Sequence, residues 1–448
     1  MNSNFENFHD YLSIVNDNEL KHTLEEMHMS EVLDVWGYLD DDDKVRLFML
    51  MDLETKVDLI NALSWNEQEH LIKTLSVENR KLLLQEMEPD DLADFIQQVP
   101  NDVRESVWNS LSHGSKQETQ FLLRFDQDDA AGLMTPRYVA IRSNITVSHA
   151  LQFIRKNLKD VETVYYIYVV DQLKRLQGVI SLRDILAGKD DEVIHDLMVK
   201  TVVTVRDETD QEEVAKILED HDFIALPVID KYSRLLGIVT FDDIIDVIRM
   251  EQTEDIYKMG AMDGSTDRYL DTNVFRLVKK RIPWLTILLL AGTITTNVLH
   301  IYEGLILGAA FLSLFIPVIT QTGGNSGTQS STLMIRGLAT GEIRFPDVGK
   351  VMLKELLVGV IMGLSMGIII LLRSMVLPPG IELYQAIAVG ISLSFVVFFS
   401  TIIGAIAPIV IHKLGFDPTV MAGPLMATVI DVIGLTIYFE TARLIMRI

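Results

Sequence analysis

The sequence predicts a multidomain protein: an all-α superhelical N-terminal domain and tandem α/β domains, followed by an α-helical transmembrane domain with five spans. Three features support this: an apolar pattern that repeats every 12 residues, similar segments at offsets of 64 and 59 residues, and long apolar stretches near the C-terminus. The charge divides in the same way. The first 280 residues carry 30 Lys and Arg against 55 Asp and Glu, whereas the rest carries 9 against 8. An acidic soluble part is therefore expected before a near-neutral membrane part.

The composition excludes several classes of function. A net charge of −24 offers no basic face for nucleic acid and favours cations as partners. The chain has no cysteine, so disulfides, thiolate metal sites and a cysteine nucleophile are excluded. The N-terminal stretch MNSNFENFHDYL has neither the basic nor the apolar region of a signal peptide, so we expect none.

The first domain, expected at 1–130, is a repeat of short helices. Between residues 30 and 112, apolar residues recur at positions i, i+1 and i+4 of each unit, which lie on one helical face. The three phases are Val35, Leu47, Leu59, Leu71, Leu83, Phe95 and Val107; Trp36, Phe48, Ile60, Ile72, Leu84, Ile96 and Trp108; and Leu39, Met51, Leu63, Leu75, Met87, Val99 and Leu111. Helix-capping residues such as Ser64 separate the units. The pattern predicts a superhelix whose helices bury these faces against their neighbours.

Acidic residues of this domain have two interpretations. Asp58, Asp90 and Asp94 are by default part of a solvated helix surface. Asp90 and Asp94 share one face at i, i+4, where like charges repel mildly, and a bridging cation would relieve that repulsion. The residues alone leave both interpretations open.

The next segment is a duplicated α/β module, with halves expected at 131–192 and 193–250. The pairs Asp171/Asp230, Gly178/Gly237 and Asp184/Asp243 keep the offset of 59 residues. Each half predicts a helix, two β-branched strands around a polar turn, and a second helix.

The stretches VVD…GVISLRD and PVID…GIVTFDD resemble the signatures of a tandem pair of CBS domains. The resemblance implies a cleft that often binds adenine nucleotides, so ATP is a candidate regulatory ligand. Positions that match this cleft are Tyr166, Arg183, Asp184, Phe223 and Pro227. The alternative is a dimerising sensor that binds no nucleotide.

The second half ends in a cluster of acids. The segment FDDIIDVIRMEQTEDI holds Asp242, Asp243, Asp246, Glu251, Glu254 and Asp255, and Asp222 precedes it. Dense carboxylates without histidine suit hard cations such as Mg²⁺ or Ca²⁺, although the loop glycine of an EF-hand is absent. A solvated face is the alternative. Residues 251–282 then form a linker and an amphipathic helix, whose basic end, 279–281, predicts a cytoplasmic membrane-surface anchor.

The membrane domain, expected at 283–448, has five candidate spans. They lie at 284–302, 304–323, 351–373, 384–411 and 420–446. One side carries Lys279, Lys280, Arg281, Arg336, Arg344, Lys350, Lys354 and Lys413, and the other carries Arg373, Arg443 and Arg447. Positive residues favour the cytosolic side, so this bias predicts a multi-pass protein of the cell membrane with cytosolic N-terminal domains and an external C-terminus.

Two stretches, 316–342 and 417–424, interrupt the lipid-like sequence with Gly, Pro and polar residues, and the second span could continue as a helix through Met334. Such residues are tolerated at membrane depth where they are buried in protein or line water. The polar members could hydrogen-bond the water shell of an ion, and the small ones could allow close helix packing. The polar residues of the first stretch are Gln321, Thr322, Asn325, Ser326, Thr328 and Gln329.

Asp431 lies near the middle of the last apolar span. A carboxylate there costs roughly 3 kcal/mol, so it normally faces water or a partner. No Lys or Arg lies between Lys413 and Arg443. Asp431 is therefore either a cation site in a pore or a protonated acid bonded to Thr428 or to a neighbouring helix.

The stretches PVITQTGGNSGTQSSTLMIRGLATGEI and GFDPTVMAGPLMATVIDVIGLTIYF resemble the signatures of the MgtE family of magnesium transporters or channels. The resemblance covers nearly the whole chain. It implies a homodimeric Mg²⁺ channel in the lipid bilayer, with its pore on the two-fold axis and closed by cytosolic Mg²⁺. The family's pore acid falls on Asp431 and its mouth acid on Asp417, whereas Gly423 replaces an amide found in some relatives. Its sensor acids fall on Asp58, Asp90, Asp94, Glu212, Asp222, Asp243, Asp246, Glu251, Glu254, Asp255 and, on a plug helix, Asp271.

Other classes of function stay open at this point. An ion-gradient-coupled divalent-cation transporter would use Asp431 as its coupling site. A membrane-tethered nucleotide or metal sensor would use the paired α/β domains without transport. An intramembrane aspartyl protease would need a second Asp-bearing span, which the sequence lacks, although a dimer could pair Asp431 with itself. We do not expect this protein to be an enzyme.

Overall fold

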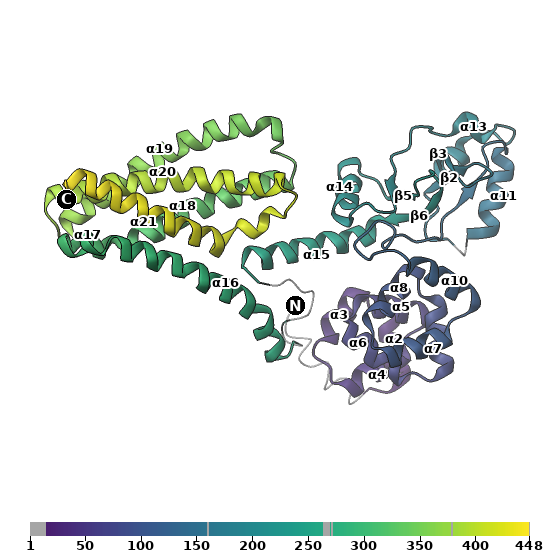
Figure 1. The fold of residues 1–448 in the computed structure, drawn as a ribbon. Helices are drawn as coiled ribbons and strands as arrows, with labels where there is room; N and C mark the ends of the chain where they lie inside the picture. Colours follow the sequence, from purple (N-terminus) through teal and green to yellow (C-terminus); the bar gives the residue numbers. More distant parts are fainter. Residues whose placement is uncertain (1–14, 159–160, 263–268, 270–271, 378–379, 448) are drawn as a thin grey trace. The chain divides into compact units, whose positions relative to one another are not determined.

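The structure is a computed structural model that describes residues 15–158, 161–262, 269, 272–377 and 380–447. It divides into two compact units, Met1–Arg249 and Met250–Ile448 (Figure 1). Helix α15, Phe241–Met259, runs across this division.

Short helices form the first part of unit 1, as the repeat predicted. They are α2 (Asp17–Glu26), α3 (Met29–Trp36), α4 (Asp41–Leu50), α5 (Leu53–Ala62), α6 (Trp65–Thr74), α7 (Val77–Glu86), α8 (Pro89–Gln98), α9 (Asn101–Ser110) and α10 (His113–Leu122). The repeated apolar residues form one buried core that includes Trp36, Phe48 and Ile60. The predicted all-α superhelical domain is confirmed, because each helix is too short to bury its apolar face alone.

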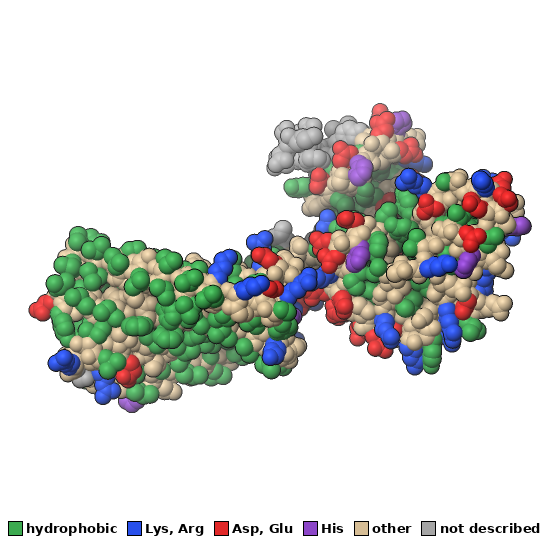
Figure 2. All heavy atoms as spheres, turned by 90° about the horizontal axis from the view of Figure 1, so that it is seen from above, with side chains coloured by type: hydrophobic (Ala, Val, Ile, Leu, Met, Phe, Trp, Pro, Cys, Tyr) green, Lys and Arg blue, Asp and Glu red, His purple; other side chains and the backbone are tan. Residues whose placement is uncertain are grey.

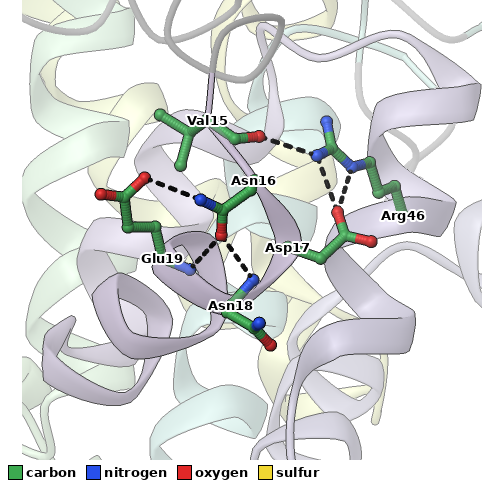
Figure 3. Close-up of polar contacts among 6 residues, drawn as sticks. All are labelled: Val15, Asn16, Asp17, Asn18, Glu19 and Arg46. Atoms are coloured by element: carbon green, nitrogen blue, oxygen red, sulfur yellow. Dashed lines mark hydrogen bonds and ion pairs between the residues drawn. The ribbon is translucent and has the colours of Figure 1, made fainter.

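Polar side chains define where these helices begin. The side chain of Asn16 accepts a hydrogen bond from the Glu19 backbone N–H at 3.0 Å and caps α2. Arg46 of α4 reaches back to the same end, where it binds the Asp17 carboxylate at 2.7 Å and the Val15 carbonyl at 3.1 Å (Figure 3). The first described helix is thus fastened to the repeat through its N-terminus.

The tandem α/β domains form two three-stranded sheets. The first domain contains β1 (Ala140–Ile141), α11 (Val147–Asn157), β2 (Tyr166–Val170), β3 (Leu176–Ser181), α12 (Leu182–Ala187) and α13 (Ile194–Leu197). The second domain contains β4 (Val205–Arg206), α14 (Gln211–His221), β5 (Ala225–Ile229), β6 (Leu235–Thr240) and the start of α15. In each sheet the first pair of strands is parallel and the second antiparallel.

Two equivalent glycines show how closely the halves correspond. A Cβ at Gly178 would lie 2.8 Å from the Val199 carbonyl oxygen, and one at Gly237 would lie 2.7 Å from that of Thr135. Thr135 and Val199 are themselves 64 positions apart, which is the other offset in the sequence. The duplicated pattern therefore encodes the same close backbone approach twice.

Unit 2 is a bundle of long helices. Its elements are α16 (Val274–Ile301), α17 (Glu303–Gly308), α18 (Phe311–Ala339), η2 (Phe345–Asp347), α19 (Val348–Val376), α20 (Leu383–Lys413), η3 (Pro418–Met421) and α21 (Gly423–Met446). Helix α20 packs against α18, α19 and α21 (Figure 1). In the most apolar segment of α20, 56% of the residues are buried, against 6% in that of α16, so α20 is central and α16 peripheral. Figure 2 shows hydrophobic side chains over the exposed face of these helices.

Four helices in the described part of the chain are long and apolar enough to cross a membrane: α16, α19 with the preceding η2, α20 and α21. The second predicted span, 304–323, is divided between the short α17 and the first part of α18. The prediction of an α-helical membrane domain is confirmed, and its count of five spans is approximate.

The stretch 316–342 does not interrupt the helix, because α18 continues through it to Ala339, beyond the possible extension to Met334. Its glycines allow close packing instead. A Cβ at Gly404 of α20 would collide with the Gly327 carbonyl oxygen, and one at Gly327 would collide with Ile430 of α21. The second stretch is irregular as predicted, since η3 precedes Gly423, whose φ is +55°.

Candidate ion path and cation-binding sites

Asp431 lies midway along α21 and is half-buried. Its side chain makes no hydrogen bond or ion pair with the part of the chain that the structure describes. Thr428, the bonding partner considered from the sequence, donates its hydroxyl to the Pro424 carbonyl at 2.8 Å instead. The helix therefore holds a carboxylate at membrane depth that no described group of its own chain satisfies.

The polar residues of α18 separate onto two sides of the helix. Gln321, Asn325 and Gln329 recur at i, i+4 and i+8 and are exposed in the single chain, so they form an amide stripe on one face. Ser326 is buried instead, with its hydroxyl 2.9 Å from the Thr401 hydroxyl of α20. The sequence offered water binding and helix packing for this segment, and in the structure the amides are exposed on one face whereas the serine is packed on another.

Glu355 of α19 is an acid that the sequence reasoning missed. It is buried, and Ser330 of α18 donates a hydrogen bond to its carboxylate at 2.9 Å. The only sequence signal for such a partner is Ser330, which lies four positions after Ser326 and so shares its helical face.

Asp417 lies between α20 and η3, beside the end of α15. Lys258 of α15 binds its carboxylate at 2.7 Å, and the Thr419 hydroxyl and backbone N–H donate to it at 2.6 and 2.8 Å. Burial opposes ionisation of Asp417, but these hydrogen bonds outweigh it and hold its pKa below the usual value. Lys258 also binds Glu254 at 2.8 Å. The structure therefore joins two of the predicted metal residues, Glu254 and Asp417, through a lysine that the sequence reasoning did not consider.

A second group of carboxylates lies within unit 1, where α8 meets the α/β domains. Asp90, Asp94 and Asp243 were predicted as metal residues, and the structure adds Asp91 and Glu162 to the same environment. The side-chain oxygens Asp90 Oδ1 and Glu162 Oε2 are buried without a hydrogen-bond partner among the described residues. Asp91 flanks a predicted residue, but nothing in the sequence pointed to Glu162.

Burial governs the ionisation of these acids. It raises the pKa of Asp90 to about 8, with further contributions from the charges of Asp91 and Glu88. It raises the pKa of Asp243 to about 8, with help from Asp90, and that of Asp94 to about 6. The pKa of Glu162 is raised too, mainly by burial. Desolvated carboxylates that face one another resist ionisation unless a cation joins them.

The remaining predicted metal residues are not brought together. Asp58, Glu212, Asp222 and Asp246 are exposed, Asp246 is paired with Arg249 at 3.3 Å, and Glu251 is partly buried. Asp255 lies near Asp417, where burial and then the charge of Asp417 raise its pKa. Asp271 lies outside the described residues. Among the described side chains, no three His, Asp or Glu residues converge closely enough to hold a metal ion.

The predicted nucleotide residues lie on both α/β domains. Tyr166 starts β2, and Pro227 lies within β5. Phe223 stacks on His221 with ring centroids 5.1 Å apart. Arg183 is exposed, whereas Asp184 accepts the Ser181 hydroxyl at 2.6 Å as part of the α12 cap. An aromatic ring and an exposed guanidinium are suitable groups for a base and a phosphate.

Several apolar helices, an intramembrane acid without a partner among the described residues, and a stripe of exposed amides are the features of a multi-pass membrane transport protein. Family models agree along the chain. Residues 316–441 match the model described as a divalent cation transporter, 27–128 match the MgtE intracellular N domain, and 130–189 and 194–250 match CBS domains.

Curated relatives match over nearly their full length. The chain is 39% identical to a protein of Thermus thermophilus named magnesium transporter MgtE, over 96% of this chain and 95% of that protein. It is 33% identical to one of that name from Enterococcus faecalis, over 96% of each. The chain therefore belongs to the MgtE family, which is a family of transporters and not of enzymes.

Solved structures support the same assignment for the soluble part. One is described as the cytosolic domain of the Mg²⁺ channel MgtE in complex with ATP. It aligns with a TM-score of 0.52 at 37% identity, over 54% of this chain and 99% of that one. Another, the soluble part of a magnesium transporter, aligns with a TM-score of 0.50 at 32% identity, over 55% of this chain and 97% of that one.

Proposed function

We propose that this chain forms a homodimer that conducts Mg²⁺ through the cell membrane into the cytosol. The observation that carries the proposal is Asp431, a carboxylate midway along α21 with no partner among the described residues of its own chain. Such a group is costly in lipid but favourable beside a cation. Relatives that match almost the whole chain are named magnesium transporters, which favours Mg²⁺ as the ion.

The amide stripe of α18 supports a pore between two chains. Gln321, Asn325 and Gln329 are exposed in the single chain, and amides of this kind avoid lipid. A second copy on a two-fold axis would enclose them in a water-filled path. Mg²⁺ gives up its water reluctantly, so amides that bind the water shell and an acid that supplies charge suit its passage. The basic residues at the helix ends favour cytosolic N-terminal domains and an external C-terminus.

Closure by cytosolic Mg²⁺ is the second part of the proposal. Buried Asp90 and partly buried Asp91, Asp243 and Glu162 fit a regulatory Mg²⁺. Two of their oxygens have no hydrogen-bond donor among the described residues, and their mutual repulsion opposes ionisation. Mg²⁺ usually binds through one or two carboxylates and keeps several waters, so a ready set of three protein ligands is not required. Asp58, Asp94, Glu212, Asp222, Asp246, Glu251, Glu254, Asp255 and Asp271 remain proposed members of this sensor.

We also propose that ATP binds the α/β pair as a regulator, with Tyr166, Phe223 and Pro227 beside the base and Arg183 and Asp184 beside the ribose and phosphates. A structural relative of the soluble part is described in complex with ATP. Arg183→Ala should weaken ATP binding at least tenfold, measured by isothermal titration of the full-length protein. Arg155→Ala, which removes another exposed arginine, should leave it unchanged. Absence of ATP binding to the unsubstituted protein would refute this part.

The transport proposal is tested with purified protein in liposomes that contain a Mg²⁺-sensitive dye. We expect Mg²⁺ influx that persists when no Na⁺ or H⁺ gradient is present and that ceases as Mg²⁺ on the cytosolic face rises. Influx that requires either gradient would favour the coupled transporter. Absence of influx at low cytosolic Mg²⁺ would favour the tethered sensor without transport.

A further inference from the structure

Lys258 holds a defined position in unit 2, near the C-terminal end of α15. Its ammonium nitrogen lies 2.7 Å from Asp417 Oδ2 and 2.8 Å from Glu254 Oε1. The lysine side chain is 28% exposed, so solvent screens these contacts less than it screens an open surface pair. One ammonium therefore bridges two carboxylates from different parts of the chain.

The backbone around this ion pair holds α15 against the start of α21. A Cβ at Gly423 would lie 2.5 Å from the Met259 carbonyl oxygen, so only a glycine allows this approach. Thr419 donates two hydrogen bonds to Asp417 and orients its carboxylate toward the lysine. Both ends of the bridge are thus positioned by contacts that do not depend on the lysine itself.

The charge at this point explains what the lysine does. Glu254 and Asp417 together carry two negative charges, which is the charge a divalent cation matches. The ammonium occupies the place between their oxygens and neutralises one of these charges. A divalent ion that binds both carboxylates has to displace the ammonium first, because both need the same oxygens.

We propose that Lys258 is a tethered competitor that sets the concentration at which a divalent cation binds Glu254 and Asp417 beside the last span. This inference deepens the proposed closure by Mg²⁺ and rests on it for its physiological meaning. The lysine keeps the two carboxylates paired while the ion is scarce, and the ion replaces it only at higher concentration.

The test is equilibrium binding of Mn²⁺ to the full-length protein in detergent, with free Mn²⁺ measured by electron paramagnetic resonance. Lys258→Met removes the charge and keeps the length of the side chain, and Lys258→Gln is a second neutral variant. We expect both to tighten one Mn²⁺ site at least tenfold. Lys258→Arg should bind Mn²⁺ as the unsubstituted protein does. Asp417→Asn in the Lys258→Met background should abolish the gain.

Lys350→Met is the matched control, since Lys350 pairs with Asp347 at 3.7 Å on an exposed surface. It should leave every Mn²⁺ site unchanged. Unchanged or weaker Mn²⁺ binding in both neutral variants would overturn the inference, because the lysine would then only position Asp417. Binding in detergent needs no flux, so loss of the transport proposal and loss of this inference are separate results.

Discussion

Replacing Asp431 with Asn should reduce Mg²⁺ influx into liposomes by roughly 100-fold or more, while the protein still folds and dimerises. The Asn side chain keeps the size and the hydrogen-bonding capacity but removes the charge. Two unit charges about 4 Å apart interact by about 4 kcal/mol at the effective dielectric constant of partly solvated sites, and the attraction to a divalent ion is larger. Asp431 has no described partner in its own chain that would retain this attraction.

The control for Asp431 is Asp347→Asn in η2, where an exposed carboxylate pairs with Lys350. This variant should conduct as the unsubstituted protein does. Equal influx in the Asp431 variant would keep transport but make Asp431 a structural residue. Size-exclusion chromatography of both variants separates a lost ion path from a lost fold.

Asp90 of α8 and Asp243 of α15 should make the stability of the soluble part depend on pH. Asp90 and Asp243 have folded pKa values of about 8, whereas an unfolded aspartate titrates near 3.9. Between these values the folded state holds more protons than the unfolded state, so the free energy of unfolding falls as pH rises. We expect the midpoint of thermal unfolding of the full-length protein to fall between about pH 5 and 8 without divalent ions, and to level off above that range.

Mg²⁺ should remove most of this fall, because a bound cation replaces the protons that the carboxylates lose. Asp90→Asn should raise the Mg²⁺-free midpoint at pH 8 by about 5 °C and should reduce the further increase caused by Mg²⁺. Asp34→Asn, which neutralises an exposed carboxylate of α3, should change neither quantity. A midpoint that rises with pH, or an equal response to Mg²⁺ in both variants, would contradict the proposed sensor.

Periodic and duplicated features of this protein were predictable from local sequence. The 12-residue spacing of Trp36, Phe48 and Ile60 defines one helical face per unit, and a helix must bury such a face. The offset that links Gly178 to Gly237 predicted two copies of one fold. Asp431 could be singled out because a charge in an apolar span is costly wherever the helices lie.

The contacts between distant residues depended on tertiary structure. Glu162 and Asp90 come from separate domains, and only the folded chain desolvates both carboxylates. The glycines of α18 interrupt the lipid-like sequence, and only the structure shows that α20 and α21 pack against them along one continuous helix. Nothing in the local sequence singles out Lys258. Its contact with Asp417, 159 positions away, is visible only in the folded chain. Local spacing therefore determined which residues form the helices and strands and which acid is anomalous. Packing determined which charges meet, because electrostatic coupling depends on distance and burial rather than on order in the chain.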